Sequence, residues 1–232
     1  MAGNADQITR VTRPREAAKA TYDGISKWYD VFVGGWEKKY REEGVRKLDV
    51  RNGERVLEIG FGTGHCIQSI AQSVGDSGKV YGMDISEGML TLTRDRVQRA
   101  GLSGRVELAL GDAVSLPFEA GFFDAVFMSF TLELFDTPDI PLVLAECMRV
   151  VKAGGRICVV ASSKEGKEGK LAVRFYEWAH RKLPAHVDCR PIFPQRSLVE
   201  AGFHLLGVSQ VSRCGLAAEI VVAVKPLKGD SR

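Results

Sequence analysis

Continuous apolar runs alternate along the chain with segments in which apolar residues recur at helical spacing. The continuous runs predict buried strands over 54–60, 79–84, 105–112, 123–130 and 156–163. The helical spacing predicts intervening helices over 64–74, 86–101 and 138–155. Continuously apolar strands that alternate with helices are typical of a parallel sheet that is covered on both faces.

The two ends of the chain depart from this alternation. Residues 21–50 carry aromatic side chains that two adjacent glycines interrupt, which predicts two short helices joined at the glycines. The tail predicts a helix over 197–203 and a hairpin of two strands, 204–212 and 216–226. We therefore expect an α/β fold with a seven-stranded, mostly parallel sheet, a last strand that runs antiparallel, and helices on both faces.

Composition and charge narrow the classes of function. Lys and Arg number 32 against 29 Asp and Glu, and this net charge of +3 is too weak to suggest nucleic-acid binding. We also expect a cytoplasmic protein, because no run reaches the roughly twenty apolar residues of a membrane helix and the N-terminus lacks an apolar signal core. The five cysteines are scattered without a C-x-x-C pair, so we expect no metal site and no disulfide framework.

The strongest chemical signal is the glycine-rich stretch EIGFGTG over 58–64, which follows one predicted strand and precedes a helix. Glycines in this position let a ligand approach the backbone closely. A dinucleotide-binding fingerprint, G-x-G-x-x-G, would need glycine where this chain has His65. The stretch also lacks the G-K-[ST] ending of a P-loop.

Acidic residues accompany this stretch at the ends of the predicted strands. Asp84 ends the second strand, where a carboxylate can accept hydrogen bonds from both hydroxyls of a ribose. Asp112 follows the third strand and can accept from an adenine amino group, although Gly-Asp is also typical of a plain turn. Glu58 lies within an apolar strand and therefore needs a charged partner. Together these carboxylates suit a ligand with an amine, a ribose and an adenine, and they would repel a pyrophosphate.

The motifs VLEIGFGTG, YGMDIS, GDA, FDAVFMSF and VVKAGG occur in this order. Over about residues 20–165 they resemble class I S-adenosylmethionine-dependent methyltransferases, and within these the ubiquinone/menaquinone biosynthesis C-methyltransferase family. The resemblance implies a Rossmann-like fold, S-adenosyl-L-methionine as cofactor and S-adenosyl-L-homocysteine as product. The residues that it implies in cofactor binding are Glu58, Gly60, Phe61, Gly62, Thr63, Gly64, Asp84, Ile85, Met89, Asp112, Ala113, Ser129, Phe130, Tyr22 and Tyr29.

Within this set the resemblance implies separate roles. Glu58 and the glycine turn meet the methionine half of the cofactor, Asp84 holds the ribose, and Asp112 meets the adenine. Ser129 and Phe130, after the fourth strand, approach the methyl-bearing centre. The two tyrosines fold over the cofactor from the N-terminal segment, or are core aromatics.

We divide the chain, as a single methyltransferase domain over 1–232, into consecutive parts. They are an N-terminal helical cap (1–50), a cofactor-binding core (54–163), a substrate-side insertion (164–195) and a C-terminal helix and hairpin (196–226). The insertion contains an amphipathic segment over 171–183 with basic residues beside its apolar face. Such a segment either docks at a membrane surface or is an ordinary covering helix.

The methyl acceptor is less well determined. The loop after the fourth strand lacks the Asn/Asp-Pro-Pro-aromatic tetrad of methyltransferases that act on nucleobases or protein glutamines. The candidate substrate residues are Trp28, Phe32, Trp36 and Arg190. The aromatics form an apolar pocket or pack in the core, and the arginine can pair with a phosphate or carboxylate. The candidate catalytic residues are His186, His65 and Tyr22, although a lone histidine is more often structural.

We therefore expect methyl transfer to a small apolar or lipid-linked acceptor, with a quinol ring carbon as first choice. Alternatives are the amine head group of a phospholipid and a small thiol. From other classes, an NAD-linked oxidoreductase and a sensor that binds the cofactor without turnover remain open. The expected partner is a small-molecule substrate, with no nucleic acid, at most peripheral membrane contact, and a monomer or homodimer as the assembly.

Overall fold

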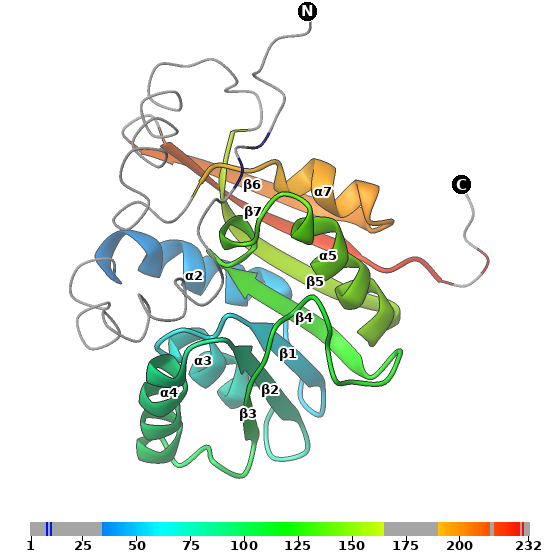
Figure 1. Ribbon diagram of the computed structural model, residues 1–232. Coiled ribbons are helices and arrows are strands. Elements are labelled where there is room, and N and C mark those ends of the chain that lie inside the picture. The colour runs from blue at the N-terminus through cyan, green and yellow to red at the C-terminus, as the bar shows by residue number, and fades with distance from the viewer. Residues whose placement is uncertain are drawn as a thin grey trace, which may run out of the picture.

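The computed structural model of the chain describes residues 8, 10, 34–164, 190–213, 216–227 and 229 (Figure 1). In chain order, its elements are α2 (Gly34–Leu48), β1 (Arg55–Ile59), α3 (His65–Ser73), β2 (Lys79–Asp84), α4 (Glu87–Arg99), β3 (Val106–Leu110), β4 (Phe123–Ser129), the 3-10 helix η2 (Leu132–Leu134), α5 (Asp139–Val150), β5 (Val151–Ser163), α7 (Pro194–Glu200), β6 (His204–Arg213) and β7 (Leu216–Val224).

The strands form one seven-stranded sheet in the order β3-β2-β1-β4-β5-β7-β6. Strands β1 to β5 pair in parallel, whereas β7 runs antiparallel to both of its neighbours, β5 and β6. This confirms the predicted sheet and its antiparallel last strand. The strand order changes direction beside β1, and ligands of open α/β sheets bind outside the carboxyl ends of the strands at such a point.

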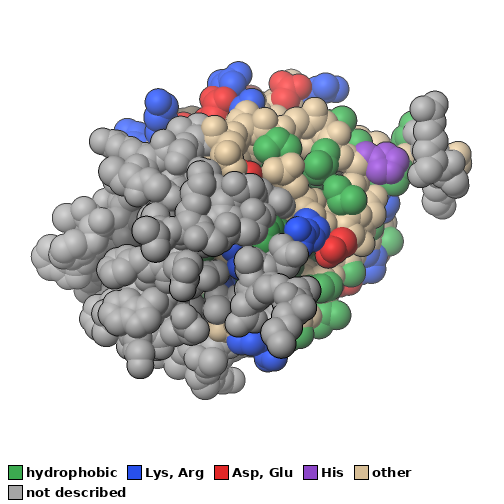
Figure 2. Space-filling view, turned by 90° about the horizontal axis from the view of Figure 1, so that it is seen from above, with side chains coloured by type: hydrophobic (Ala, Val, Ile, Leu, Met, Phe, Trp, Pro, Cys, Tyr) green, Lys and Arg blue, Asp and Glu red, His purple; other side chains and the backbone are tan. Residues whose placement is uncertain are grey.

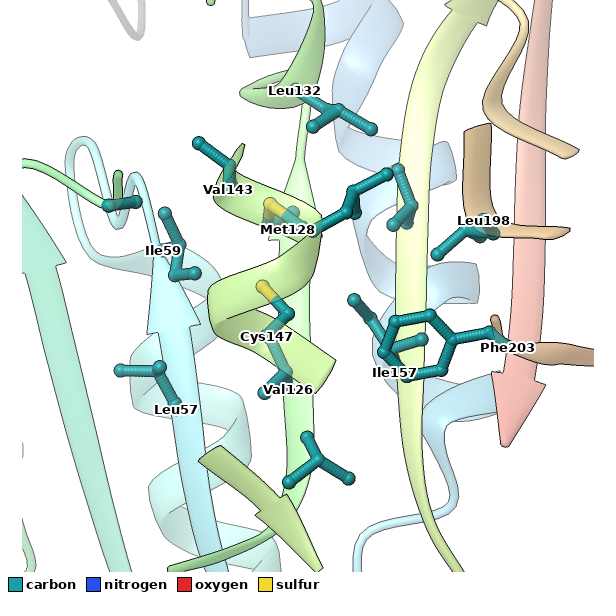
Figure 3. Packing of buried hydrophobic residues seen from close by; sticks show 14 of the residues in the cluster. Leu57, Ile59, Val126, Met128, Leu132, Val143, Cys147, Ile157, Leu198 and Phe203 are labelled. Atoms are coloured by element: carbon teal, nitrogen blue, oxygen red, sulfur yellow. The ribbon is translucent and has the colours of Figure 1, made fainter. Parts of the chain in front are cut away.

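Alternate residues of each central strand enter two separate hydrophobic clusters, because successive side chains point to opposite faces of a sheet. In β4, Val126 and Met128 join the cluster that contains residues of α5 and α7. Their neighbour Phe127 joins the cluster that contains residues of α2, α3 and α4. Figure 3 shows Val143 and Cys147 of α5 over β4. The helices therefore cover both faces of the sheet, as predicted.

The boundary between α5 and β5 differs from the prediction of a helix over 138–155. The helix ends at Val150, and β5 begins at Val151, which pairs with Phe123 across the sheet. The backbone N–H of Gly154 donates to the carbonyl of Lys225 at 2.9 Å. The two glycines therefore lie in the entry of β5 and do not cap the helix, because sheet pairing competes with helix continuation there.

Two terminal predictions also change in detail. Helix α7 begins at Pro194 and ends at Glu200, earlier than the predicted 197–203, because proline suits the first turn of a helix. Helix α2 begins at Gly34, as predicted for the second of two joined helices. The first of the two, and most of the insertion over 164–195, lie outside the described residues.

The described surface mixes side chains of all kinds. Figure 2 looks onto the molecule from above Figure 1, and its described part shows hydrophobic side chains among polar atoms, with acidic and basic side chains both present. None of the helices within the described ranges is long and apolar enough to cross a membrane.

Candidate cofactor and active site

The turn after β1 bends at three glycines with positive φ: 71° at Gly60, 50° at Gly62 and 83° at Gly64. A Cβ atom on Gly60 would overlap the side chain of Thr131, and one on Gly64 would lie 2.7 Å from the side chain of Thr93. A Cβ atom on Gly62 would meet nothing within 4 Å. The outer glycines therefore permit close packing, and the middle one leaves the backbone open for a ligand.

Side chains of α4 hold the turn in place. The Thr93 hydroxyl donates to the carbonyl of Gly62 at 2.7 Å, and Nε of Arg96 donates to the carbonyl of Thr63 at 2.7 Å. The sequence analysis missed both residues, since each lies about thirty positions from its partner and has no motif of its own. Because these carbonyls are engaged, the turn keeps one shape before a ligand arrives.

Asp84 joins the end of β2 to this turn. Its Oδ2 accepts from the backbone N–H of Gly62 at 3.0 Å, and its Oδ1 accepts from the backbone N–H of Ser86 at 3.0 Å. A carboxylate oxygen can accept more than one hydrogen bond, so Asp84 can hold the turn and still receive ligand hydroxyls. Of the neighbouring predicted residues, Ile85 is half-buried, whereas Met89 lies in the hydrophobic core together with Phe61.

Asp112 lies beyond the end of β3, at the same edge of the sheet. The backbone N–H of Gly111 donates to the carbonyl of Asp84 at 3.0 Å and so ties the two strand ends together. Oδ1 of Asp112 accepts from the N–H of Val114 at 3.1 Å. This hydrogen bond forms the plain turn that the Gly-Asp pair also predicted. Ala113 is buried. The turn and the adenine interpretation are compatible, because the bond from Gly111 holds Asp112 at the same edge of the sheet as Asp84.

Glu58 is the most unusual group of β1. Its side chain is 2% exposed, and its Oε2 has no hydrogen-bond partner in the part of the chain that the structure describes. Burial, reinforced by the charge of Asp84, raises the pKa of Glu58 well above its ordinary value, and Arg41 of α2 opposes the shift. The charged partner expected from the sequence therefore acts from a distance. A buried carboxyl oxygen without a donor indicates a place for a donor group of a ligand.

Two further buried carboxyl groups at this edge were missed by the sequence analysis. Glu133 of η2 is 0% exposed; its Oε1 accepts from the N–H of Ser162 at 3.0 Å, whereas Oε2 has no partner among the described residues. Burial raises the pKa of Glu133 to about 8, with a contribution from Glu37 of α2. Glu37 pairs with Arg41 at 3.1 Å, and burial raises its pKa to about 7. A single glutamate in the apolar run FTLELF was the available signal.

The carboxyl end of β4 is strained and carries another unpartnered atom. Phe130 has φ 51°, although it is not glycine, and its ring packs edge-on against Tyr40 with centroids 6.4 Å apart. The Oγ atom of Ser129 is buried, and the described residues offer it no hydrogen-bond partner. Strain and an unpartnered hydroxyl are both typical of a binding site, and we keep both residues as predicted neighbours of the methyl-bearing centre.

The structure gives Arg190 a different setting from the predicted one. The side chain is 0% exposed, and its guanidinium donates to the carbonyls of Glu133 (3.3 Å) and Phe135 and to the hydroxyl of Thr137 (3.0 Å). Burial lowers its pKa to about 10. This setting argues against a contact with an acceptor phosphate or carboxylate, because the guanidinium donors already hold the chain after β4.

The remaining predicted residues have side chains that are exposed or lie outside the described part of the chain. His65 is exposed at the start of α3. Trp36 lies in α2, but its side chain is outside the described part. The other predicted catalytic and aromatic residues lie outside the described residues: Tyr22, Trp28, Tyr29, Phe32 and His186. The structure thus brings Glu58, the glycine turn, Asp84, Asp112 and Ser129 together at one edge.

This geometry suits a cation-bearing nucleoside. The buried carboxyl of Glu58 has an oxygen without a donor, and the open backbone at Gly62 leaves room for a ligand. S-adenosylmethionine carries a sulfonium, an ammonium and a nucleoside, and so it meets these features. An edge rich in carboxylates would repel the pyrophosphate of NAD.

Comparisons with known proteins agree with S-adenosylmethionine as the cofactor. Residues 9–188 match the model of the ubiE/COQ5 methyltransferase family. The chain is 36% identical over 160 residues to the ubiquinone/menaquinone biosynthesis C-methyltransferase UbiE of Teredinibacter turnerae, covering 69% of this chain and 62% of that protein. It is 32% identical over 226 residues to the demethylmenaquinone methyltransferase of Symbiobacterium thermophilum, covering 82% and 88%.

The fold itself recurs in solved structures. The [4+2]-cyclase SpnF superposes with a TM-score of 0.76 at 20% identity, covering 95% of this chain and 100% of that one. At this identity the likeness concerns the fold alone. The match of the family model over residues 9–188 shows the family: the chain belongs to the ubiE/COQ5 methyltransferase family of S-adenosylmethionine-dependent enzymes.

Proposed function

We propose that the protein transfers a methyl group from S-adenosylmethionine to a ring carbon of a small, lipid-linked quinol. The observation that carries this proposal is the match along 88% of a demethylmenaquinone methyltransferase. The matched region covers 62% of the Teredinibacter protein, so the assignment of the acceptor rests on similarity of the shared part. The buried Glu58 and the open glycine turn support the cofactor half of the proposal.

The cofactor, when bound, supplies a methyl group already activated on a sulfonium. The chain therefore has to bind, orient and exclude water, and these effects can lower a barrier by several kcal/mol, up to about 11. Asp84 accepts from the ribose hydroxyls and Asp112 from the adenine amino group. Glu58 accepts from the ammonium of the methionine part through the oxygen that has no partner among the described residues. Carboxylates near the sulfonium also favour the cationic donor over its neutral product.

The decisive experiment supplies methyl-labelled cofactor with each acceptor class in turn. The acceptors are a demethylated naphthoquinol, phosphatidylethanolamine vesicles and a small thiol such as thiophenol. We expect label in the naphthoquinol, attached to carbon, and about tenfold less of it with the Asp84→Ala variant when the cofactor concentration is well below its dissociation constant. Label in the lipid amine or the thiol would replace the quinol as acceptor. Tight cofactor binding without transfer to these acceptors or to a cell extract would favour the sensor alternative.

A further inference from the structure

We propose that Glu133 is the catalytic base that removes the proton from the methyl acceptor, and that Glu37 is a positioning residue acting through it. This proposal rests on the proposed function, because a ring carbon must lose a proton when it gains a methyl group. A thiolate or free amine would need no such group. The proposal adds an acceptor-side role to a residue that the sequence motifs do not mark.

The first support is placement. Thr131 lies directly against Gly60 of the cofactor turn, so that a Cβ atom there would overlap it. Glu133 comes two residues later, and its Oε1 accepts from the N–H of Ser162 near the end of β5 at 3.0 Å. The carboxyl group therefore lies on the β5 side of the cofactor turn, at the carboxyl edge where ligands of this fold bind.

The second support is an unmet hydrogen-bonding need. Glu133 is 0% exposed, and its Oε2 has no partner among the described residues. A buried polar atom without a partner destabilises a protein, and a ligand group that binds there removes this cost. A ring hydroxyl or an acidic C–H of an acceptor would supply the missing partner.

Two charged groups act on Glu133 from neighbouring segments: the buried guanidinium of Arg190 attracts its carboxylate, and the carboxylate of Glu37 on α2 repels it. Nε of Arg190 donates to the backbone carbonyl of Glu133 at 3.3 Å. On α2, Glu37 forms an ion pair with Arg41 at 3.1 Å. The negative charge of Glu37 raises the pKa of Glu133. Hydrogen bonds from the backbone and side chain of Ser162 on β5 and from the backbone N–H of Glu133 itself favour the ionised form, and burial outweighs them. The carboxyl thus holds a proton more tightly than an ordinary glutamate.

That proton affinity suits a base. Burial raises the pKa of Glu133 to about 8, and the neighbouring Glu37 contributes in the same direction. A general base acts best when its pKa lies near the working pH, since it is then both partly ionised and strong enough to accept a proton. An ordinary glutamate would be ionised but too weak.

The step balances without another reactant. The acceptor carbon forms a bond to the methyl carbon, and the electron pair of the broken methyl–sulfur bond stays on sulfur. The proton on that ring carbon passes to Oε2 of Glu133, whose charge it neutralises. The proton then leaves to water, which returns the carboxylate for the next turnover.

The test uses Glu133→Gln, which keeps an oxygen for the Ser162 N–H and removes the titrating group. We expect turnover of the naphthoquinol to fall 100-fold or more, the usual share of a general base, while affinity for S-adenosylhomocysteine changes less than twofold. In the wild type, the rate rises with pH to a plateau above about 8, and in the variant this rise disappears. A variant that retains both the rate and the rise would overturn the proposal.

Two companion variants separate a base from a structural carboxyl. Glu37→Gln removes the neighbouring acid, so the rise of the rate moves to lower pH and the plateau rate remains within a few-fold. Glu219→Gln is the matched control, because Glu219 is also buried but accepts from the side chains of Gln195 and Gln210. We expect that control to leave both rate and pH profile unchanged.

An infrared measurement tests the role of Glu133 separately from the labelling assay. The difference spectrum between wild type and Glu133→Gln should show a protonated carboxyl band that vanishes with a midpoint near pH 8. Adding 1-naphthol to the complex with S-adenosylhomocysteine should shift this band, because the ring hydroxyl binds Oε2. If the enzyme labels the naphthoquinol and 1-naphthol still leaves the band unchanged, the role of Glu133 is overturned. Absence of label transfer to the quinol would overturn the proposed acceptor and, with it, the need for a base.

Discussion

The backbone N–H of Gly62 donates to Oδ2 of Asp84 across 3.0 Å, which joins the cofactor turn after β1 to the end of β2. The same carboxylate uses its other oxygen to accept from Ser86, the N-cap residue of α4. One side chain therefore orders the turn and helix start while presenting lone pairs to a ligand.

Replacement of Asp84 should reveal both of these roles. We expect Asp84→Ala to weaken binding of S-adenosylhomocysteine by tenfold or more, which corresponds to about 1.4 kcal/mol. Asp84→Asn keeps one oxygen acceptor and should lose less. Titration calorimetry gives both affinities. Asp95→Asn is the control, because Asp95 lies exposed on α4 and pairs only with Arg99 in the contacts described, at 3.1 Å. Equal affinity of Asp84→Ala and wild type would remove Asp84 from the site.

Gly62 lies in the turn after β1, and Gly101, which follows α4, is a matched control for it. Both have positive φ, 50° and 69°, and a Cβ atom on either would meet nothing within 4 Å. Alanine at each position should therefore reduce the free energy of unfolding by a similar amount, about 1–2 kcal/mol, through backbone strain alone. Only Gly62→Ala should also weaken cofactor binding, as measured by calorimetry. Equal cofactor affinity in the two variants would show that no ligand approaches this backbone.

Glu133 should make stability depend on pH. Its pKa is about 8 in the folded chain against an ordinary 4.5, so between these values the folded state holds a proton that the unfolded state has lost. Wild-type stability relative to Glu133→Gln should therefore be greatest below about pH 4.5 and fall as pH rises towards 8, by up to about 1.4 kcal/mol per pH unit. Urea unfolding of both proteins at several pH values measures this difference. A difference that does not vary with pH would contradict the burial of an ionisable group.

Arg190 should matter for stability. Arg190→Ala leaves the carbonyls of Glu133 and Phe135 without their guanidinium donors in the interior, and we expect a loss of about 2–4 kcal/mol. Arg190→Lys should recover only part, because one ammonium cannot reach all the oxygens that the guanidinium fork serves. Thermal melts measure the stability of both variants, and the KM for the acceptor tests whether Arg190 contacts the acceptor instead. A stable Arg190→Ala protein with a raised KM would restore the predicted acceptor contact.

Much of the fold and half of the site could be predicted from local patterns. Apolar runs and helical spacing predicted the strands and the alternation of helices, because the period of side chains along an element is a local property. The glycine turn over 58–64 could be predicted because its residues are consecutive, and Asp84 because it ends the next predicted strand. The C-terminal end of α5 could not, because pairing of Val151 with Phe123 decided where the helix stopped.

The sequence by itself thus determined the layered α/β architecture, the glycine turn after β1 and the family. Only the tertiary structure decided which glycines pack against threonines and which one stays open. It alone brought Glu37 of α2 within electrostatic reach of Glu133, and it placed Arg190 on backbone carbonyls where a substrate contact was predicted. The physical reason is range: propensity and periodicity act between near neighbours, whereas burial and charge depend on segments that the sheet brings together from distant parts of the chain.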